Sequence, residues 1–296
     1  MSPPLVGSPS AVYTLSTRTV ESGGGPVRSE VDDPGNRLRN SGCRHVLIMV
    51  HGFNNSASQA KQSYLLQLEM LESGIRQSRS APDAIAFFHW PGDVGGWFSV
   101  TGYPWDIPQA QRSAERLATY LTNFPAASNP GAVKVSIVAH SLGCRLILEM
   151  LARNLPAGLA LNIELINLLA PAVPVRLVEE GTLQVSVRSP RQVLKCFSNQ
   201  DGVLRNAFPA GQLAAHELGT EPQYYSEAVG LNGHPTTMGT PVERSIGHSD
   251  YWGDRIAANQ FLTALDPTLR RLPLPRALAE RGLADATGIA GRELAS

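Results

Sequence analysis

The chain has 296 residues, of which 43% are hydrophobic and 17% charged, so it is long enough to bury a full apolar core. Its 25 basic and 25 acidic residues are interspersed and give a formal net charge of zero. Such a chain has no strong electrostatic field to attract phosphate backbones or anionic lipid. Nucleic acid is therefore excluded as an expected partner.

The first ten residues are rich in proline and serine and contain neither a basic nor an apolar stretch, so no signal peptide is expected. No segment approaches the roughly 20 apolar residues of a membrane-spanning helix. We therefore expect a cytoplasmic protein without a membrane span. Cys43, Cys144 and Cys196 are an odd number of cysteines, two of them within apolar segments, and we expect all three to be reduced and structural.

Residues 1–42 are expected to hold one short strand, near Val12 to Arg18, followed by a flexible loop. Residues 21–42 are rich in glycine, proline and charge and show no periodicity. The run from Gly23 to Gly25 does not predict a phosphate-binding loop, because no Gly-Lys-Ser/Thr follows it and no strand directly precedes it. These 42 residues form a first unit ahead of a main domain predicted at residues 43–266.

From Arg44 onward, short apolar runs alternate with amphipathic stretches, a pattern typical of a parallel sheet wrapped by helices. Near-continuous apolar character indicates strands that are buried on both faces. The predicted strands are 45–50, 84–88, 133–139, 162–169 and 192–198. The predicted helices are 56–72, 107–124, 142–154 and 251–265, the last with Ile256, Phe261, Leu262 and Leu265 as its main apolar residues. Residues 267–296 form a tail that could hold one weak helix or be poorly ordered.

A predicted strand, a tight turn and a helix meet at Ala139-His140-Ser141-Leu142-Gly143. In a nucleophile elbow the serine sits on a strained strand-to-helix turn, and small residues two positions before and after it let strand and helix approach closely. Ala139 and Gly143 are those residues here, with alanine in place of the usual first glycine. A lone serine before a helix is more often a helix cap, but this full context favours Ser141 as a nucleophile.

Two main-chain amides beside Ser141 are candidates for an oxyanion hole. The amide of Leu142 lies at the N-terminus of the following helix, which can face a developing negative charge. The predicted strand 45–50 runs into His51-Gly52-Phe53, and hydrolases with such an elbow place the second donor after a strand that ends in His-Gly. The amide of Phe53 is the predicted donor, although Gly52 could instead be an ordinary turn glycine before a capped helix.

A serine hydroxyl needs a base to take its proton and a third group to orient that base. His140 adjoins the nucleophile in a tight turn and is poorly placed to share its proton, so we expect it to support the turn by packing or hydrogen bonding, or to contact substrate. His248 lies in a glycine-containing loop that runs into the last predicted helix, as the base loop of this type of fold does. His216 lies in a helix-like surface stretch, and His234, the main alternative base, lies in a Gly-His-Pro turn.

Asp201 is the predicted group that orients the base. The predicted strand 192–198 runs into Asn-Gln-Asp201-Gly, which places the carboxylate just past the carboxyl end of a strand, on the same edge of the sheet as Ser141. An Asp-Gly pair by itself is an ordinary turn signal. Its place between the elbow and His248 favours the functional interpretation.

These segments resemble the α/β-hydrolase superfamily, and within it a family of unknown function whose members carry a His-Gly-Phe-Asn-Asn strand end. The resemblance spans residues 45–265 in order, through VLIMVHGFNNS, FFHWPGD, IVAHSLG, SNQDG and GHSDYW. It implies a mostly parallel central sheet of roughly eight strands, flanked by helices on both faces. It also implies the roles given above to Ser141, Asp201 and His248, but no substrate.

The site is expected to be open, because only about twenty residues separate the predicted strands 162–169 and 192–198, too few for a large cap domain. The segment 203–247 could cover it and is expected to be loop-like, since it is polar and rich in glycine and proline.

The segment 89–105 contains every tryptophan except Trp252. Its Trp97 and Phe98 could line an apolar wall for an acyl or aryl group, or the whole segment could pack against the core.

The sequence thus predicts a serine hydrolase that cleaves a carboxylic ester or thioester through an acyl-enzyme, with Ser141, Asp201 and His248 as its triad. An acyltransferase or amidase would use the same residues, and a non-catalytic binding protein could keep the fold, although no damage to the triad is visible. Motifs for zinc, calcium or dinucleotide binding are absent, so no metal or cofactor is expected. The expected partner is a small-molecule ester or acyl substrate, and the oligomeric state stays open.

Overall fold

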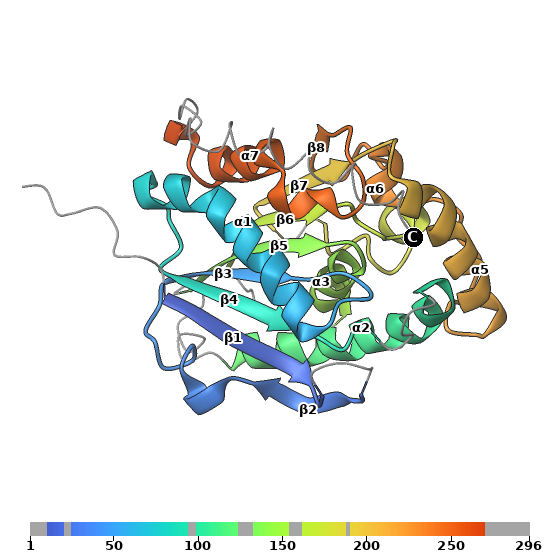
Figure 1. Ribbon diagram of the computed structural model, residues 1–296, viewed down its shortest axis with the longest axis horizontal. Helices are drawn as coiled ribbons and strands as arrows, with labels where there is room; N and C mark the ends of the chain where they lie inside the picture. The colour runs from blue at the N-terminus through green and yellow to red at the C-terminus, as the bar shows by residue number, and fades with distance from the viewer. Residues whose placement is uncertain are drawn as a thin grey trace, which may run out of the picture.

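The computed structural model describes residues 11–20, 25–93, 99–123, 133–153, 162–187 and 190–269 (Figure 1). Their centre is an eight-stranded sheet in the order β2-β1-β4-β3-β5-β6-β7-β8. The strands are β1 (Ala11–Arg18), β2 (Val27–Asp32), β3 (His45–Val50), β4 (Ala84–His89), β5 (Lys134–His140), β6 (Asn162–Leu169), β7 (Gln192–Phe197) and β8 (Thr240–Glu243). β1 and β2 pair antiparallel, and every other neighbouring pair is parallel. The predicted mostly parallel sheet is confirmed.

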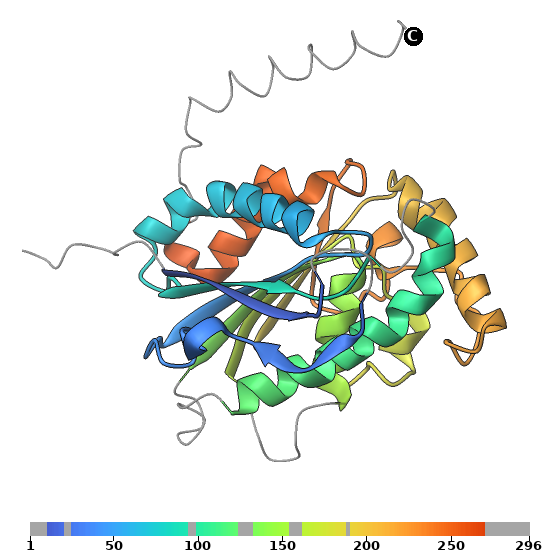
Figure 2. The same cartoon turned by 60° about the horizontal axis from the view of Figure 1, so that its bottom comes forward.

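Helices cover both faces of this sheet, as predicted. Figure 2 shows α1 and α7 on one face and α2 and α3 on the other. The α-helices are α1 (Ala57–Gln77), α2 (Ser99–Thr122), α3 (Leu142–Arg153), α4 (Val175–Glu179), α5 (Phe208–Glu217), α6 (Val229–Asn232) and α7 (Arg255–Leu265). Shorter turns are η1 (Pro34–Asn36), the π-helical η3 (Val203–Ala207), η4 (Asp250–Gly253) and η5 (Pro267–Leu269). Between β6 and β7 the described residues hold α4 and turns, so the prediction of no large cap is confirmed.

Local sequence signals explain the elements that were predicted best. β3 and β6 have the predicted bounds, and all six residues of β3 are buried, as a central parallel strand requires. Ser56 and Gln59 form a capping box that starts α1. Asp254 caps α7 by accepting from the amides of Ile256 and Ala257.

The interpretation of residues 21–42 as a loop was wrong for β2. This strand lies at the edge of the sheet, and its mostly exposed side chains give no apolar alternation that a sequence pattern could reveal. β1 also hydrogen-bonds along β4, so the first predicted unit contributes two strands to the same sheet as the main domain. Arg18 at the end of β1 forms a buried ion pair with Asp93 at 2.6 Å.

Two further expectations were wrong in detail. α2 begins at Ser99 rather than 107, which puts Tyr103 and Trp105 in a helix rather than a loop. The segment 203–247 is not loop-like, because it contains η3, α5, α6 and β8. Of the main apolar residues named for α7, Phe261, Leu262 and Leu265 are buried, and Ile256 is 47% exposed. Trp97, Phe98 and residues 270–296 of the tail lie outside the described residues.

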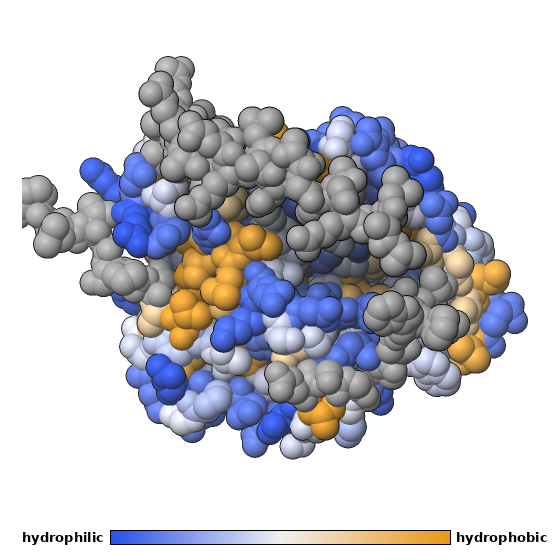
Figure 3. Space-filling view, in the orientation of Figure 1, coloured by the Kyte–Doolittle hydropathy of each residue, from blue (hydrophilic) through white to orange (hydrophobic). Residues whose placement is uncertain are grey.

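The surface seen in Figure 3 carries scattered apolar side chains over α1 and α5, where Leu65, Leu66 and Leu213 are about half exposed. All three cysteines are buried and unpaired, as predicted. No helix in the described part of the chain is both long and apolar enough to cross a membrane.

Candidate active site

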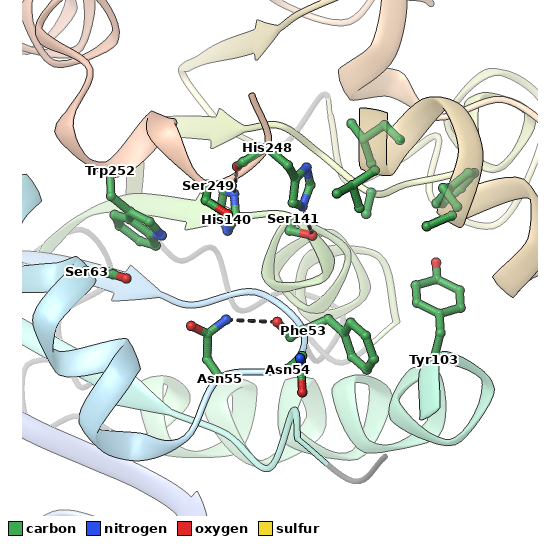
Figure 4. Close-up of a pocket in the computed structure, with 15 residues that line it drawn as sticks. Phe53, Asn54, Asn55, Ser63, Tyr103, His140, Ser141, His248, Ser249 and Trp252 are labelled. Carbon is green, nitrogen blue, oxygen red and sulfur yellow. Dashed lines mark hydrogen bonds between the residues drawn. The ribbon is translucent and has the colours of Figure 1, made fainter. Parts of the chain in front are cut away.

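Three parallel strands deliver the three predicted residues to one place. Ser141 follows β5, Asp201 follows β7 by four residues, and His248 lies in the loop after β8. The Ser141 hydroxyl donates to His248 Nε2 at 2.9 Å, and the Nδ1–H group of His248 donates to Asp201 Oδ2 at 2.7 Å. The alternative bases, His216 and His234, are exposed side chains on α5 and beyond α6. The structure thus places the three residues that the sequence predicted within hydrogen-bonding distance of one another (Figure 4 shows Ser141 and His248).

The carboxylate of Asp201 is held from both sides. Its side chain is fully buried, and while Oδ2 accepts from His248, Oδ1 accepts from the amide of Leu204 at 2.9 Å. With both oxygens engaged, the carboxylate cannot rotate freely. It therefore selects the His248 tautomer that carries its proton on Nδ1 and leaves Nε2 as the acceptor facing Ser141.

Steric crowding explains the small residues around Ser141. The φ angle of Ser141 is 53°, a left-handed conformation that costs an L-residue about 1–2 kcal/mol. A Cβ on Gly143 would lie 2.3 Å from the His51 carbonyl oxygen, and a Cβ on Gly52 would lie 2.7 Å from Ser141 Cβ. The two glycines therefore let the end of β3 pass directly beside the serine turn.

This close approach puts two main-chain amides next to Ser141. Within the part of the chain that the structure describes, neither the Phe53 nor the Leu142 amide donates to a protein acceptor. The Gly52 carbonyl accepts from His51 Nδ1 at 2.8 Å, which fixes the Gly52–Phe53 peptide plane. Because the N–H and C=O groups of a trans peptide point in opposite directions, the Phe53 amide is directed away from His51. Both amides are thus free to bind an external oxygen.

His51 is built into the core beneath this strand end. Burial, and then the proximity of His89, lower the pKa of His51 well below its usual value, so the ring stays neutral. Its Nε2 accepts from the Trp90 amide at 3.2 Å, which leaves Nδ1 as the donor to Gly52. Trp90 also stacks on His51 and donates Nε1 to the His51 carbonyl at 2.8 Å. For Trp90, the core-packing interpretation of the aromatic segment is confirmed.

His140 supports the loop that carries His248. It is only 6% exposed, and its Nε2–H group donates to the His248 carbonyl at 2.8 Å. Burial, followed by the nearby His248, lowers the pKa of His140 to about 3. The predicted hydrogen-bonded support is confirmed, whereas a contact with substrate stays a prediction.

Beside Ser141 lies a cavity of about 320 Å³, within the range of small-molecule sites (Figure 4). Its described lining comes from the end of β3, α1, α2, η3, the start of α5 and the loop around His248. The lining residues are Phe53, Asn54, Asn55, Ser63, Tyr103, His140, Ser141, Ala172, Val203, Leu204, Ala207, Phe208, His248, Ser249 and Trp252.

Most of this lining was not predicted as site residues. Val203 to Phe208 follow Asp201 closely, and Ser249 and Trp252 follow His248. Their nearness in sequence to the predicted triad residues could have indicated that they line the cavity. Ser63 and Tyr103 reach the cavity from α1 and α2 through packing that no local motif records.

Residues 203–221, which we call the cover segment, are fastened by buried charges. Glu221 forms an ion pair with Arg145 of α3, and Arg145 Nε also lies 3.4 Å from Glu149. All three side chains are almost fully buried. This network ties the end of the cover segment to the helix that begins after Ser141.

Among the described residues, no group of three or more His, Cys, Asp or Glu side chains is arranged to bind a metal ion.

The family described as "Alpha/beta hydrolase of unknown function (DUF900)" matches residues 28–207, well over half of the chain. The chain belongs to this family. The match includes Ser141 and Asp201 and ends before His248. No curated protein matches the chain.

Solved structures with a similar arrangement have low identity. They include an uncharacterized protein from Bacillus cereus ATCC 10987 (13% identity, covering 76% of this chain and 60% of that chain, TM-score 0.41). Others are esterase PE8 (14%, 86% and 100%, TM-score 0.42) and an uncharacterised protein from Capnocytophaga ochracea DSM 7271 (16%, 79% and 58%, TM-score 0.45). The chain spans about three fifths of the length of the two uncharacterised proteins. Likenesses at this level carry no argument about activity.

Proposed function

We propose that this protein is a serine hydrolase that cleaves a neutral carboxylic ester, or a thioester, through an acyl-enzyme on Ser141. The observation that carries the proposal is the hydrogen-bonded chain from Ser141 through His248 to Asp201, at 2.9 and 2.7 Å. An ordinary surface serine has no such partner, and the strained turn beneath Ser141 is the kind of backbone cost found at functional sites.

In the proposed reaction, Ser141 Oγ attacks the ester carbonyl carbon as its proton moves to His248 Nε2. Asp201 stabilises the resulting imidazolium without taking the proton itself. The amides of Phe53 and Leu142 donate to the oxyanion, whose charge develops as the tetrahedral intermediate forms.

The C–O bond to the alcohol then breaks, and the alcohol leaves with the proton from His248. In the second half, a water molecule gives a proton to His248 as its oxygen attacks the acyl carbon. The bond between that carbon and Ser141 Oγ then breaks, His248 returns the proton to Oγ, and the carboxylic acid leaves.

The lining of the cavity supports a neutral substrate. No Asp, Glu, Lys or Arg belongs to the described lining, so nothing there would pair with a charged substrate. Amidase and acyltransferase activity use the same triad and are the alternatives that the experiment must separate.

The experiment is a panel of p-nitrophenyl esters of increasing acyl length, run beside an acyl thioester and aryl amides. Turnover of esters above amides, abolished in Ser141→Ala, supports the proposal. Faster transfer to an added alcohol than to water would indicate an acyltransferase. Absence of turnover on the whole panel would support a binding protein.

A further inference from the structure

The two asparagines of the His-Gly-Phe-Asn-Asn strand end have no part in the proposed reaction. Asn54 and Asn55 follow Phe53, whose main-chain amide is the proposed oxyanion donor, and they lead into Ser56, the N-cap of α1. The φ angle of Asn54 is 57°, a left-handed conformation that needs support from its surroundings. The bonds that hold this turn therefore decide where the Phe53 amide points.

The peptide group between Phe53 and Asn54 is held at both of its ends. Its carbonyl, on Phe53, accepts a hydrogen bond from Asn55 Nδ2 at 2.8 Å, drawn as a dashed line in Figure 4. Its N–H group, on Asn54, donates to the Gly92 carbonyl. Since the atoms of a peptide group lie in one plane, these two opposed bonds fix the orientation of that plane.

The preceding peptide group, between Gly52 and Phe53, is held only at its carbonyl end. The Gly52 carbonyl accepts from His51 Nδ1 at 2.8 Å, and from Asn55 Nδ2 at 3.4 Å. The N–H group of this peptide is the Phe53 amide, which has no protein acceptor among the described residues. Asn55 Nδ2 thus bridges the carbonyls on both sides of the Phe53 Cα atom, and its loss would free the rotations that redirect this amide.

Asn55 is fixed at its own base. It is half-buried and directly precedes Ser56, whose side chain forms the capping box of α1 with Gln59. Its side-chain amide therefore starts from a defined helix end. Such support matters for an oxyanion donor, because a donor is most effective when it needs no reorientation during the reaction.

We propose that Asn55 is a positioning residue, whose side-chain amide holds the Phe53 amide in the orientation that binds the oxyanion. This inference rests on the proposed acyl-enzyme reaction. Asn55 acts through Phe53 and does not touch the reacting atoms. Loss of its hydrogen bonds should therefore weaken binding of the transition state and leave binding of the substrate unchanged.

Two variants remove the hydrogen bonds in different ways. In Asn55→Leu the two terminal methyl groups replace the amide nitrogen and oxygen, so the shape is kept, whereas Asn55→Ala also removes the volume. Both should lower kcat for p-nitrophenyl butyrate about ten- to hundredfold, with KM changed by less than about twofold, since loss of a whole oxyanion donor costs about 10²–10³-fold. Expressing kcat per site titrated with a fluorophosphonate removes the contribution of unfolded protein.

Two ketones with the same carbon skeleton measure the oxyanion hole directly. With trifluoromethyl pentyl ketone, Ser141 Oγ bonds to the carbonyl carbon, the π pair moves to the oxygen, and the serine proton moves to His248 Nε2. Methyl pentyl ketone binds without this addition. In both Asn55 variants the inhibition constant of the trifluoromethyl ketone should rise by about the factor by which kcat falls, and that of the methyl ketone should change less than about twofold.

Gln184→Ala is the matched control. Like Asn55, Gln184 donates from a side-chain amide to a main-chain carbonyl, that of Glu179 at 2.7 Å, but it lies outside the described lining of the cavity. This variant should leave kcat and both inhibition constants unchanged.

Three results would overturn the inference and leave the proposed function standing. They are an unchanged kcat per titrated site in Asn55→Leu, equal weakening of both ketones, as expected if Asn55 contacts the ligand, and a loss confined to Asn55→Ala, as expected if Asn55 only fills space. If Asn55→Leu does not fold, Asn55→Ala with the ketone pair decides. Absence of wild-type turnover on the whole ester panel would overturn the proposed function and this inference together.

Discussion

The strand ends that carry Ser141 and Phe53 are held in place differently from the cover segment, part of which lines the same cavity. The strand ends depend on glycines without room for a Cβ and on His51 and His140, both kept neutral by burial. The cover segment depends on the opposite arrangement, a buried ion pair between Arg145 and Glu221.

In the proposed reaction, the strand ends would position the reacting groups and the cover segment would select the substrate. Rigid, uncharged support suits groups that must be placed within a few tenths of an ångström for bond making. A segment that is held at one end by side-chain contacts suits substrate selection. Its cavity-lining residues can vary without disturbing the turns that carry Ser141 and Phe53. Variants of the two regions should therefore fail in different ways.

The largest effect is expected at the strand ends. Ser141→Ala and His248→Ala should each reduce kcat by roughly four to six orders of magnitude, and the double variant should be no worse, because the triad acts as a unit. Asp201→Asn should cost about 10⁴-fold, since it keeps the shape but loses the tautomer selection. Steady-state kinetics on p-nitrophenyl butyrate measure all four variants.

These variants should remain folded. Thermal unfolding should show Ser141→Gly to be more stable than Ser141→Ala by about 1 kcal/mol, because glycine adopts the positive φ without strain. Additive losses in the double variant, or unfolding of Ser141→Ala, would break the comparison between the two regions.

The strand ends were also the part that the sequence predicted best. From Val46 to Val50, β3 is an uninterrupted apolar run. Gly52 and Gly143 are glycines because the neighbouring chain passes too close to leave room for a Cβ. Such steric demands are local, so they appear within a few residues of Ser141 and His51. The order of Ser141, Asp201 and His248 along the chain supplied the rest.

The fold of the cover segment could not be predicted, because the residues that hold it in place are distant in sequence. Arg145 and Glu221 meet across 76 residues, and Tyr103 reaches Gln212 across 109. Nothing near Glu221 distinguishes it from an exposed glutamate. The polar residues of β2 misled for a similar reason, since this strand forms by pairing with β1 rather than from an apolar pattern of its own.

The second largest effect concerns the buried charges of the cover segment. Glu221→Gln leaves the Arg145 guanidinium short of one partner and should lower the free energy of unfolding by about 3 kcal/mol. Glu72→Gln is the matched control, because Glu72 pairs with Arg76 on the surface, where such pairs contribute about 0–1 kcal/mol. Urea unfolding gives both values. Equal effects would mean that the Arg145 network does not fasten the cover segment.

A pH-dependent effect should follow from the buried neutral histidines of the strand ends. Burial lowers the pKa of His140 to about 3 and of His89 to about 4, below the value of 6.5 for the unfolded chain. The unfolded chain therefore binds more protons, and stability should fall as pH drops from about 6.5 toward 4. The slope should be on the order of 1.4 kcal/mol per pH unit for each histidine.

His89→Gln should flatten this slope by removing one of the buried neutral histidines, which also include His51 and His140, while having less effect at pH 8. Urea unfolding at several pH values measures it. An unchanged slope would show that acid acts elsewhere in the molecule.

The smallest effect is a change of substrate preference at the cover segment. Val203 lines the cavity beside Ser141 and is 45% exposed, so Val203→Ala should leave no hole in the core. It should lower kcat/KM for octanoate relative to acetate esters by up to about tenfold, from lost apolar contact. Leu213→Ala, on α5 but outside the lining, is the control. Loss of activity on acetate as well would mean that the cover segment also positions the reacting groups.

Labelling with a fluorophosphonate, followed by peptide mass spectrometry, tests the central claim most directly. Such probes react with a serine whose proton is taken by a base beside an oxyanion hole, and not with ordinary serines. The account predicts one adduct per chain, on the peptide that contains Ser141, and its loss in His248→Ala and in urea-unfolded protein. A folded protein that stays unlabelled, or carries its adduct on another serine, would contradict it.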